Sequence, residues 1–249
     1  MYVQLAGTSI RLLGSMHLFA ASSPRMPAWI DRAFDWAESL VFESDAAAFL
    51  PLLRQPEDAA LEQLLGPERW NQLARSWPSE GALAPLRALK PWAVLIAAPT
   101  LCQRVVEGVE PRLQRRALGD AKSWRYLESV EEIAASLEAI PPAAIRDGLA
   151  TLLADPGEPQ RTLEQMQAAW LQRDLATLWQ IASATPLFAL PGLREAILDA
   201  RNRAWAPRIR ALTQAPGRTL VVIGALHLCG ADSLLAHLQH PVEPVDVGE

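Results

Sequence analysis

Short apolar runs and a helical pattern alternate over the opening part of the chain. Residues 9–14 and 40–42 are runs of the kind that form buried strands. Between them, after a loop through residues 22–24, apolar residues recur at the spacings of one helix face. These residues are Trp29, Ile30, Ala33, Phe34 and Ala37. A strand, a helix and a strand in this order pair the two strands in parallel through a right-handed crossover, so we expect a βαβ unit.

The middle of the chain has a helical pattern that is interrupted only once by a strand. Residues from about 46 to 121 are rich in Ala, Leu and Pro. The prolines divide this stretch into short helices, because proline is poorly tolerated inside a helix. Residues from about 130 to 215 are again mostly helical, and a third strand at residues 123–127 lies between the two stretches. We therefore expect two large helical insertions.

The strand pattern returns near the end of the chain. Residues 219–223 form another continuous apolar run, and residues 244–247 are a candidate edge strand. Few strands and many helices predict an α/β (α+β-like) fold, in which a small mixed, mainly parallel sheet carries the two helical insertions. No fixed-period repeat or low-complexity linker divides the chain, so we expect a single domain over residues 1–249.

Composition is that of an ordinary globular protein. The chain has 249 residues, 50% of them hydrophobic, which is long enough to bury a sizeable core. Its net charge is −5 and its basic residues form no cluster, which argues against nucleic acid as a partner. Cys102 and Cys229 are far apart and form no CxxC pair, so neither a disulfide framework nor a cysteine-ligated zinc site is expected. We interpret Cys229 as a small buried residue, with a place in the wall of a site as the alternative.

No targeting or membrane-spanning segment is visible in the sequence. The first residues pass into a strand without the basic segment and the long apolar run of a secretory signal. No stretch reaches the roughly 20 apolar residues that a membrane span needs. The sequence as written predicts a cytoplasmic protein without a membrane span, or a periplasmic or secreted one if a leader has been removed.

Two motifs near opposite ends of the chain have the same form. Gly14-Ser15-Met16-His17 and Gly224-Ala225-Leu226-His227 each follow a strand-like run, and they contain two of the four histidines. A glycine directly after a buried strand allows a sharp turn. The histidine then lies beyond the C-terminal end of the strand, where open α/β sheets bind their ligands. We expect the two histidines to meet across neighbouring strands.

Two acidic residues, Glu43 and Glu128, also end strand-like runs. Charged residues are common at strand ends simply because the chain meets solvent there. Together with His17 and His227, however, carboxylates form a donor set for a divalent ion such as Mn, Co or Zn, with a position left open for water. Such an ion makes its bound water acidic, and a further carboxylate can then act as a general base.

A polar pair lies beside an apolar stripe in the last long helical segment. The stripe consists of Leu198, Trp205, Ile209 and Leu212. Arg201 and Asn202 flank this stripe rather than oppose it, so they need polar partners if they are half-buried. The site carboxylates or a substrate carbonyl can supply those partners; the alternative is an Arg that extends past Trp205 to solvent. Pro207 is expected to kink this helix or to mark a boundary.

Five segments together resemble the TraB/PrgY/GumN superfamily, which includes the Tiki metalloproteases and is related to erythromycin esterase and ChaN-like folds. The segments are Leu13-Gly14-Ser15-Met16-His17-Leu18, Ala37–Asp45, Lys90-Pro91-Trp92, Arg201-Asn202-Arg203-Ala204-Trp205 and residues 223–230. Two other segments depart from the family pattern. Gly108-Val109-Glu110 stands where the family tends to have G-V-D, and Leu127-Glu128-Ser129 is followed by Glu131-Glu132-Ile133, without the glutamine of the family's E-x-Q.

The resemblance implies a metal-dependent hydrolase that acts on a peptide or another small substrate. In that interpretation the ion ligands are His17, Glu43 and His227, and the catalytic residues are Glu43, Glu128, Arg201 and Asn202. Glu128 would assist proton transfer, and Arg201 with Asn202 would polarise the scissile carbonyl. A second interpretation is a metal-free, esterase-like hydrolase in which His17 is the general base and Glu43 orients it. A third is a binding protein that sequesters a peptide or haem without turnover.

Overall fold

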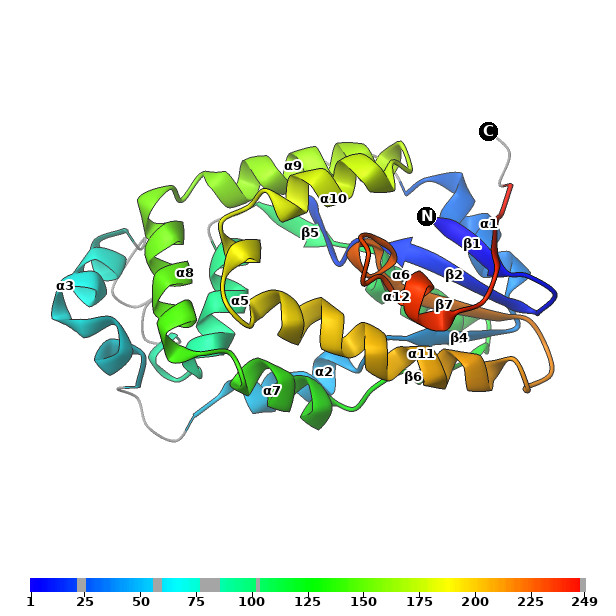
Figure 1. Cartoon of the computed structure of the whole chain (residues 1–249), viewed down its shortest axis with the longest axis horizontal. Coiled ribbons are helices and arrows are strands. Elements are labelled where there is room, and N and C mark those ends of the chain that lie inside the picture. Colours follow the sequence, from blue (N-terminus) through cyan, green and yellow to red (C-terminus); the bar gives the residue numbers. More distant parts are fainter. Residues whose placement is uncertain (22–25, 56–59, 77–85, 102–103, 247–249) are drawn as a thin grey trace.

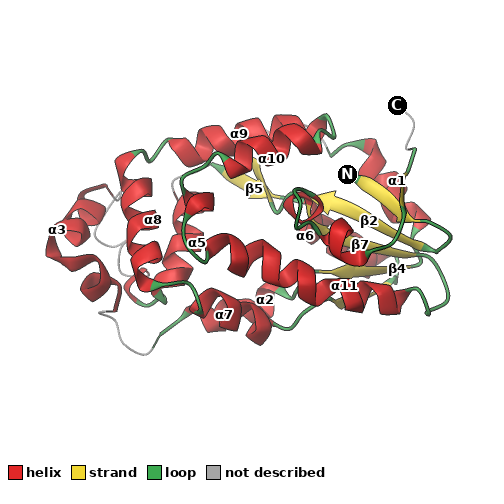
Figure 2. Ribbon diagram, in the orientation of Figure 1, coloured by secondary structure: helices red, strands yellow, loops and turns green. Residues whose placement is uncertain are grey.

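A six-stranded sheet lies at one end of the elongated molecule, and helices cover it and extend beyond it (Figures 1 and 2). The computed structural model describes residues 1–21, 26–55, 60–76, 86–101 and 104–246. The predicted loop at residues 22–24, Cys102 and Val247 lie outside the described residues. Within the described part, no helix is both long and apolar enough to cross a membrane.

Four neighbouring strands of the sheet are parallel. The order across it is β6-β4-β7-β2-β1-β8. Neighbouring strands from β6 to β2 pair in parallel, whereas β1 pairs antiparallel with both β2 and β8. The strands are β1 (Tyr2–Leu5), β2 (Ile10–Ser15), β4 (Ser39–Phe42), β6 (Ser123–Tyr126), β7 (Thr219–Gly224) and β8 (Val242–Pro244). The predicted α/β fold with a mixed, mainly parallel sheet is confirmed.

The predicted βαβ unit is present, but its two strands are not neighbours. Helix α1 (Ala28–Trp36) connects β2 to β4, and its buried face carries Trp29, Ile30, Ala33 and Phe34. Strand β7 lies between β2 and β4 and pairs in parallel with both. All residues of β7 are buried, because both edges of the strand are paired and both faces of the sheet are covered. A strand from the end of the chain thus joins two strands from its beginning.

Successive residues of the central strands face two different helix layers. Leu13, Leu40 and Val222 belong to a core cluster with α1 and α6 (Val109–Gly119). Val41 and Val221 belong to another, with α11 (Ala200–Leu212) and α12 (Leu234–Leu238). Side chains alternate between the two faces along a strand, so a sheet covered on both sides needs apolar residues at nearly every position. This requirement produces the continuous apolar runs in the sequence.

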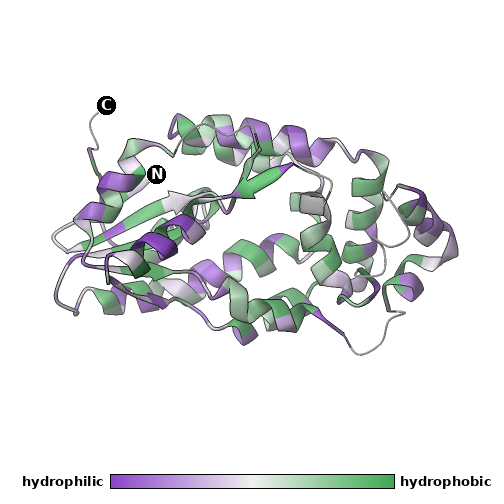
Figure 3. Ribbon diagram, turned by 180° about the vertical axis from the view of Figure 1, so that it is seen from behind, coloured by the Kyte–Doolittle hydropathy of each residue, from purple (hydrophilic) through white to green (hydrophobic). Residues whose placement is uncertain are grey.

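The helices that extend beyond the sheet have an apolar core of their own. Figure 3 shows hydrophobic and hydrophilic residues on the same helices, as amphipathic packing requires. The remaining helices are α2 (Ala46–Phe49), α3 (Ala60–Ser76), α5 (Pro91–Leu101), α7 (Val130–Glu138), α8 (Pro142–Ala154), α9 (Glu158–Leu171) and α10 (Leu175–Ser183), with the 3-10 turns η1 (Leu50–Leu53), η2 (Leu187–Ala189) and η4 (Ala225–Leu228). All of these elements except η4 lie within the two stretches for which a helical pattern was expected, about 46–121 and 130–215.

Some elements differ from the sequence-based expectations. Strand β5 (Val105–Glu107) interrupts the first helical stretch and pairs antiparallel with β3 (Leu18–Ala20), so a purely helical reading of residues 46–121 is wrong at this point. Strands of three residues are too short to show a periodicity. The edge strand β8 shares only Pro244 with the predicted range 244–247, since an exposed edge strand has no apolar run to fix its ends.

Pro207 does not mark a helix boundary. Helix α11 continues through it to Leu212, and Trp205 and Ile209 on either side of it are fully buried in the core. Tertiary packing of this face outweighs the loss of one backbone hydrogen bond. A π-helical turn, η3 (Glu195–Asp199), leads directly into α11. Such turns are rare and often occur near functional sites.

Candidate functional site

The C-terminal ends of three neighbouring strands bring His17, Glu43 and His227 together. His17 lies just beyond β2, Glu43 directly follows β4, and His227 lies in the short turn after β7. Nε2 of His17 is 3.7 Å from Oε1 of Glu43, and Nε2 of His227 is 3.8 Å from the same oxygen. The three residues expected at one sheet edge therefore lie together, and the two histidines flank one carboxylate oxygen of Glu43.

Each glycine of the two GxxH motifs packs against the other motif. A Cβ atom on Gly14 would lie 3.2 Å from Cβ of Ala225, and a Cβ atom on Gly224 would lie 3.1 Å from Nε2 of His17. Both glycines belong to strands, and neither has a positive φ. The expectation that they allow sharp turns is therefore wrong. Glycine is needed because paired β2 and β7 bring the two motifs into close approach.

Glu43 is held as a carboxylate from both sides. The backbone N–H of Gly224 donates to Oε1 at 2.6 Å, and Nη2 of Arg201 donates to Oε2 at 2.7 Å. Burial by itself would raise the pKa of Glu43. The charges of Arg201 and His17 and the Gly224 hydrogen bond outweigh burial and hold that pKa well below its usual range. Glu43 is thus an anion at neutral pH.

His227 is buried and held in one tautomer. Its Nδ1 donates to Oδ1 of Asn202 at 2.7 Å, and its ring packs on Trp205 with the ring centroids 4.4 Å apart. Burial lowers the pKa of His227 to about 3, so the ring is neutral at neutral pH. With the proton on Nδ1, the lone pair of Nε2 faces Glu43. The amide of Asn202 also donates from Nδ2 to the carbonyl of Asp232 at 2.9 Å, so both ends of this side chain are engaged within the protein.

His17 is the exposed member of the cluster, with 59% of its side chain accessible. Its Nδ1 lies 2.9 Å from Oε1 of Glu110, which also accepts a hydrogen bond from the Ser15 hydroxyl. The negative charge of Glu110, with a smaller contribution from Glu43, raises the pKa of His17 to about 9. Without a competing cation, His17 is therefore an imidazolium ion between two carboxylates.

Glu110 is the site residue that sequence reasoning missed. It lies in the first turn of α6, shortly after β5, which is too short to be recognised as a strand from the sequence. The segment before it is held by the backbone, because the N–H groups of Gly108 and Val109 donate to the carbonyls of His17 and Met16, both at 2.9 Å. A Cβ atom on Gly108 would lie 1.9 Å from the Met16 carbonyl oxygen. The G-V-E segment, noted above only as a departure from G-V-D, was the available signal.

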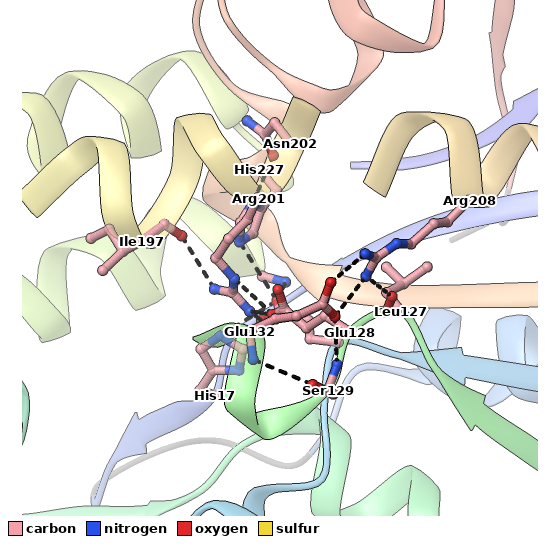
Figure 4. Close-up of polar contacts among 12 residues, drawn as sticks. His17, Leu127, Glu128, Ser129, Glu132, Ile197, Arg201, Asn202, Arg208 and His227 are labelled. Carbon is pink, nitrogen blue, oxygen red and sulfur yellow. Dashed lines mark hydrogen bonds and ion pairs between the residues drawn. The ribbon is translucent and has the colours of Figure 1, made fainter. Parts of the chain in front are cut away.

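Arg201 connects Glu43 to Glu128. Its Nε donates to Oε1 of Glu128 at 2.8 Å, and its Nη1 donates to the carbonyl of Ile197 at 3.2 Å, as Figure 4 shows. Only 13% of the Arg201 side chain and 4% of the Glu128 side chain are exposed. The alternative in which Arg201 extends to solvent is therefore wrong. Burial raises the pKa of Glu128 even though Arg201 opposes the shift.

Two sets of donors at this edge are candidates for an ion site. Ligand atoms of His17, Glu43 and Glu110 all lie within 4.8 Å of one another. The other set is the predicted one, in which two Nε2 atoms flank Oε1 of Glu43 at 3.7 and 3.8 Å. Ligands at about 2.1 Å from a tetrahedral ion are about 3.4 Å apart, so both His–Glu43 distances of the predicted set are within a few tenths of an ångström of this value. His227 is not in the group of described residues whose donors all lie within 4.8 Å, so the two histidine nitrogens must move closer to each other to share an ion.

Cys229 is a structural residue rather than a ligand. Its thiol is 3.3 Å from the carbonyl oxygen of Ala225, and burial raises its pKa to about 12. Metal ligation and nucleophilic attack both need the thiolate. The interpretation of Cys229 as a small buried residue agrees with these contacts.

Comparison with known proteins identifies the family. The sequence pattern of the TraB/PrgY/gumN family matches residues 2–241. The chain belongs to the TraB/PrgY/gumN family. It is similar to the uncharacterized protein YbaP of Escherichia coli K12, with 28% identity over 237 residues that cover 90% of this chain and 85% of YbaP. YbaP of Shigella flexneri shows the same identity and coverage. No solved structure matches the chain.

Membership of the TraB/PrgY/gumN family confirms the resemblance inferred from the motifs. The family pattern also bears on the G-V-E segment, because Glu110 occupies the position where the family tends to have the aspartate of G-V-D. Both residue types carry a carboxylate, and in this structure that carboxylate contacts His17. The departure from the family pattern therefore retains the charged group.

Proposed function

We propose that this protein is a metal-dependent hydrolase, with His17, Glu43 and His227 as the ligands of a divalent ion such as Mn, Co or Zn. The observation that carries the proposal is the position of two Nε2 atoms at 3.7 and 3.8 Å from one oxygen of Glu43. These distances are too long for hydrogen bonds and close to the separation of atoms that share an ion.

The contacts behind the three ligands support the same proposal. In both histidines the Nδ1 atom is already occupied, by Glu110 for His17 and by Asn202 for His227. Histidine ligands in metal sites usually donate their second ring N–H to a carboxylate or carbonyl group in this way, which fixes the tautomer and the ring orientation. Both Nε2 atoms are thereby directed at the same oxygen of Glu43.

The balance of charge also favours a cation. Glu43, Glu110 and Glu128 contribute three carboxylates to the cluster, and Arg201 is the permanent cation that contacts two of them. Glu110 is paired only with the exposed His17 and the Ser15 hydroxyl among the described contacts. A divalent ion would balance the remaining negative charge and would take the place of the proton on Nε2 of His17.

The roles of the other residues follow from their contacts. A bound divalent ion supplies acidified water near neutral pH. Glu128, whose pKa burial raises, is the group suited to accept and return a proton. Arg201 keeps Glu43 and Glu128 in place and remains the candidate for polarising a substrate carbonyl. Asn202 acts as a positioning residue for His227, because both ends of its amide are engaged. A peptide substrate rests on the family resemblance, and the exposed ring of His17 provides access from solvent.

The metal-free alternative has a specific difficulty. In the absence of an ion the pKa of His17 is about 9, so at neutral pH the ring carries its proton and cannot accept another. A metal-free esterase-like hydrolase would need Glu128 as its base instead of His17. A binding protein that sequesters a peptide or haem remains the third interpretation, and it differs from both in having no turnover.

The test is a titration of chelated protein with Mn²⁺, Co²⁺ and Zn²⁺ by calorimetry. We expect one strong site in the wild type, and at least roughly tenfold weaker binding in His17→Ala and His227→Ala. His240→Ala is the matched control, because Nε2 of His240 bonds the Ala6 carbonyl and takes no part in the cluster. Equal affinity in all variants would refute the site. Cleavage of an unstructured peptide mixture before and after chelation then separates a hydrolase from a sequestering protein.

A further inference from the structure

A cavity of about 250 Å³ lies between helices α9 and α10 and the turns η2 and η3. Most of the side chains that line it are apolar, and they include Pro159, Leu163, Met166, Ala182, Leu187 and Phe188. An apolar cavity of about 150 Å³ is large enough to hold benzene. The cavity can therefore accept one branched aliphatic or aromatic side chain, and it is smaller than the roughly 300–1,000 Å³ of typical sites for drug-sized ligands.

Two residues connect the cavity to the site described above. Leu226 lines the cavity and directly precedes His227. Ile197 also lines it, and its carbonyl accepts a hydrogen bond from Nη1 of Arg201 at 3.2 Å. Figure 4 shows Ile197 and Arg201 on successive turns of the same helical segment. The lining of the cavity thus includes one residue next in sequence to a proposed ligand and one residue in contact with Arg201.

Three polar residues, Glu158, Thr162 and Thr185, line the cavity, and both hydroxyl donors are engaged within the protein. The hydroxyl of Thr162 donates to Glu158 at 2.7 Å, and the hydroxyl of Thr185 donates to the carbonyl of Ala182 at 2.8 Å. A polar side chain that entered the cavity would lose its hydration without gaining these donors. An apolar side chain would lose only unfavourable contact with water.

We infer that this cavity receives an apolar side chain of the substrate, next to the bond that is cleaved. The inference rests on the proposed function for the position of that bond. It assigns a substrate class to the site, namely peptides with an apolar residue beside the cleavage point.

The test uses two probes of nearly equal size, N-acetyl-leucine amide and N-acetyl-asparagine amide. Their binding to the full chain is measured by NMR titration after chelation, so that neither an ion nor turnover is needed. We expect the leucine amide to bind at least roughly tenfold more tightly, because burial of one such side chain has about that effect or more.

Two pairs of variants locate the binding. Thr162→Trp places a large ring at the half-exposed lining of the cavity and should weaken binding of the leucine amide about tenfold, whereas Gln165→Trp, on the exposed part of the same helix, should leave it unchanged. Phe188→Ala removes part of the cavity wall and should weaken binding of the leucine amide several-fold. The matched control is Phe49→Ala, because Phe49 is also half-buried but packs on Trp92 outside the cavity. Circular dichroism confirms that each variant is folded.

The outcomes separate this inference from the proposed function. Equal binding of the two amides, or equal loss in a variant and its control, overturns the inference even if the protein binds an ion and cleaves peptides. Selective binding that only Thr162→Trp and Phe188→Ala weaken supports the cavity as a side-chain site, even if the titration with divalent ions shows no binding and the hydrolase proposal fails.

Discussion

Replacing Gly224 with alanine tests the geometry of the site with a single methyl group. The new Cβ atom would lie 3.1 Å from Nε2 of His17 and 3.3 Å from Oε1 of Glu43. Gly224 has φ −54° and ψ 133°, a conformation that alanine adopts without strain. The N–H that donates to Glu43 is retained. The substitution therefore acts through the space between two proposed ligands and leaves the backbone as it is.

The size of the effect follows from these distances. Ordinary contact begins at 3.4 Å, so the ligand atoms must move by a few tenths of an ångström. Metal sites tolerate deviations of about 0.2 Å in their ligand distances. We expect affinity for Mn²⁺ or Zn²⁺ to fall at least about tenfold. Overpacking a buried position costs about 1–3 kcal/mol of stability.

Gly14→Ala is the matched control for this prediction. Its Cβ atom would lie 3.0 Å from Cδ1 of Leu228 and 3.2 Å from Cβ of Ala225, so the crowding is similar but falls on apolar atoms. Urea denaturation of the chelated proteins should show comparable losses of stability. Calorimetric titration should show weakened ion binding in Gly224→Ala alone. The reasoning is refuted if Gly224→Ala binds the ion as tightly as the wild type, or if Gly14→Ala loses just as much affinity.

Three further predictions concern single side chains. Asn202→Ala should weaken ion binding about 10–100-fold and lower the free energy of unfolding by about 1–3 kcal/mol, because it frees the ring of His227 and leaves its Nδ1–H unpaired. Calorimetry measures the change in ion affinity, and urea denaturation measures the change in stability. Unchanged ion affinity would contradict the positioning role of Asn202. In chelated protein, Glu110→Gln should lower the titration midpoint of His17, followed by NMR, from about 9 toward its ordinary 6.5. Because the pKa of His17 is raised in the folded state, its protonation stabilises the protein below pH 6.5, and this stabilisation is lost as the pH rises to 9. The pH dependence of stability should therefore be smaller in Glu110→Gln. An unchanged titration midpoint of His17 would rule out Glu110 as the cause of its raised pKa. Iodoacetamide at pH 8 should leave Cys229 unmodified in the folded protein and alkylate it in urea, because burial raises the pKa of its thiol to about 12. Peptide mass spectrometry measures the modification. Rapid alkylation of Cys229 in the folded protein would contradict its burial.

Strands β2, β4 and β7 and the three site residues that follow them were predictable because of how a doubly covered sheet is built. Its central strands need apolar residues on both faces, and the first polar residue after each strand emerges at the sheet edge. His17, Glu43 and His227 are such residues. The order of the strands was not predictable in the same way. Nothing in the run 219–223 indicates that β7 inserts between β2 and β4, because that choice is made by tertiary packing.

The contact of Glu110 with His17 and the packing role of the two glycines could not be predicted from the sequence. Glu110 reaches His17 because backbone hydrogen bonds hold Gly108 and Val109 against the segment before β3, and such bonds leave no pattern of side chains in the sequence. The glycines of both GxxH motifs were identified correctly as constrained positions. Their constraint is a contact between distant segments, whereas a single sequence shows only what is local.

The place of β7 in the sheet determines when the site can exist during synthesis of the chain. The strands that carry His17 and Glu43 are made before β7, the strand that separates them, and both helical stretches are made in between. Until it arrives, β2 and β4 each have an unpaired edge, which is a risk for misassembly. The second histidine arrives with the same segment. A nascent chain that ends before β7 therefore lacks one of the three proposed ligands, and the proposed site cannot form until β7 pairs with β2 and β4.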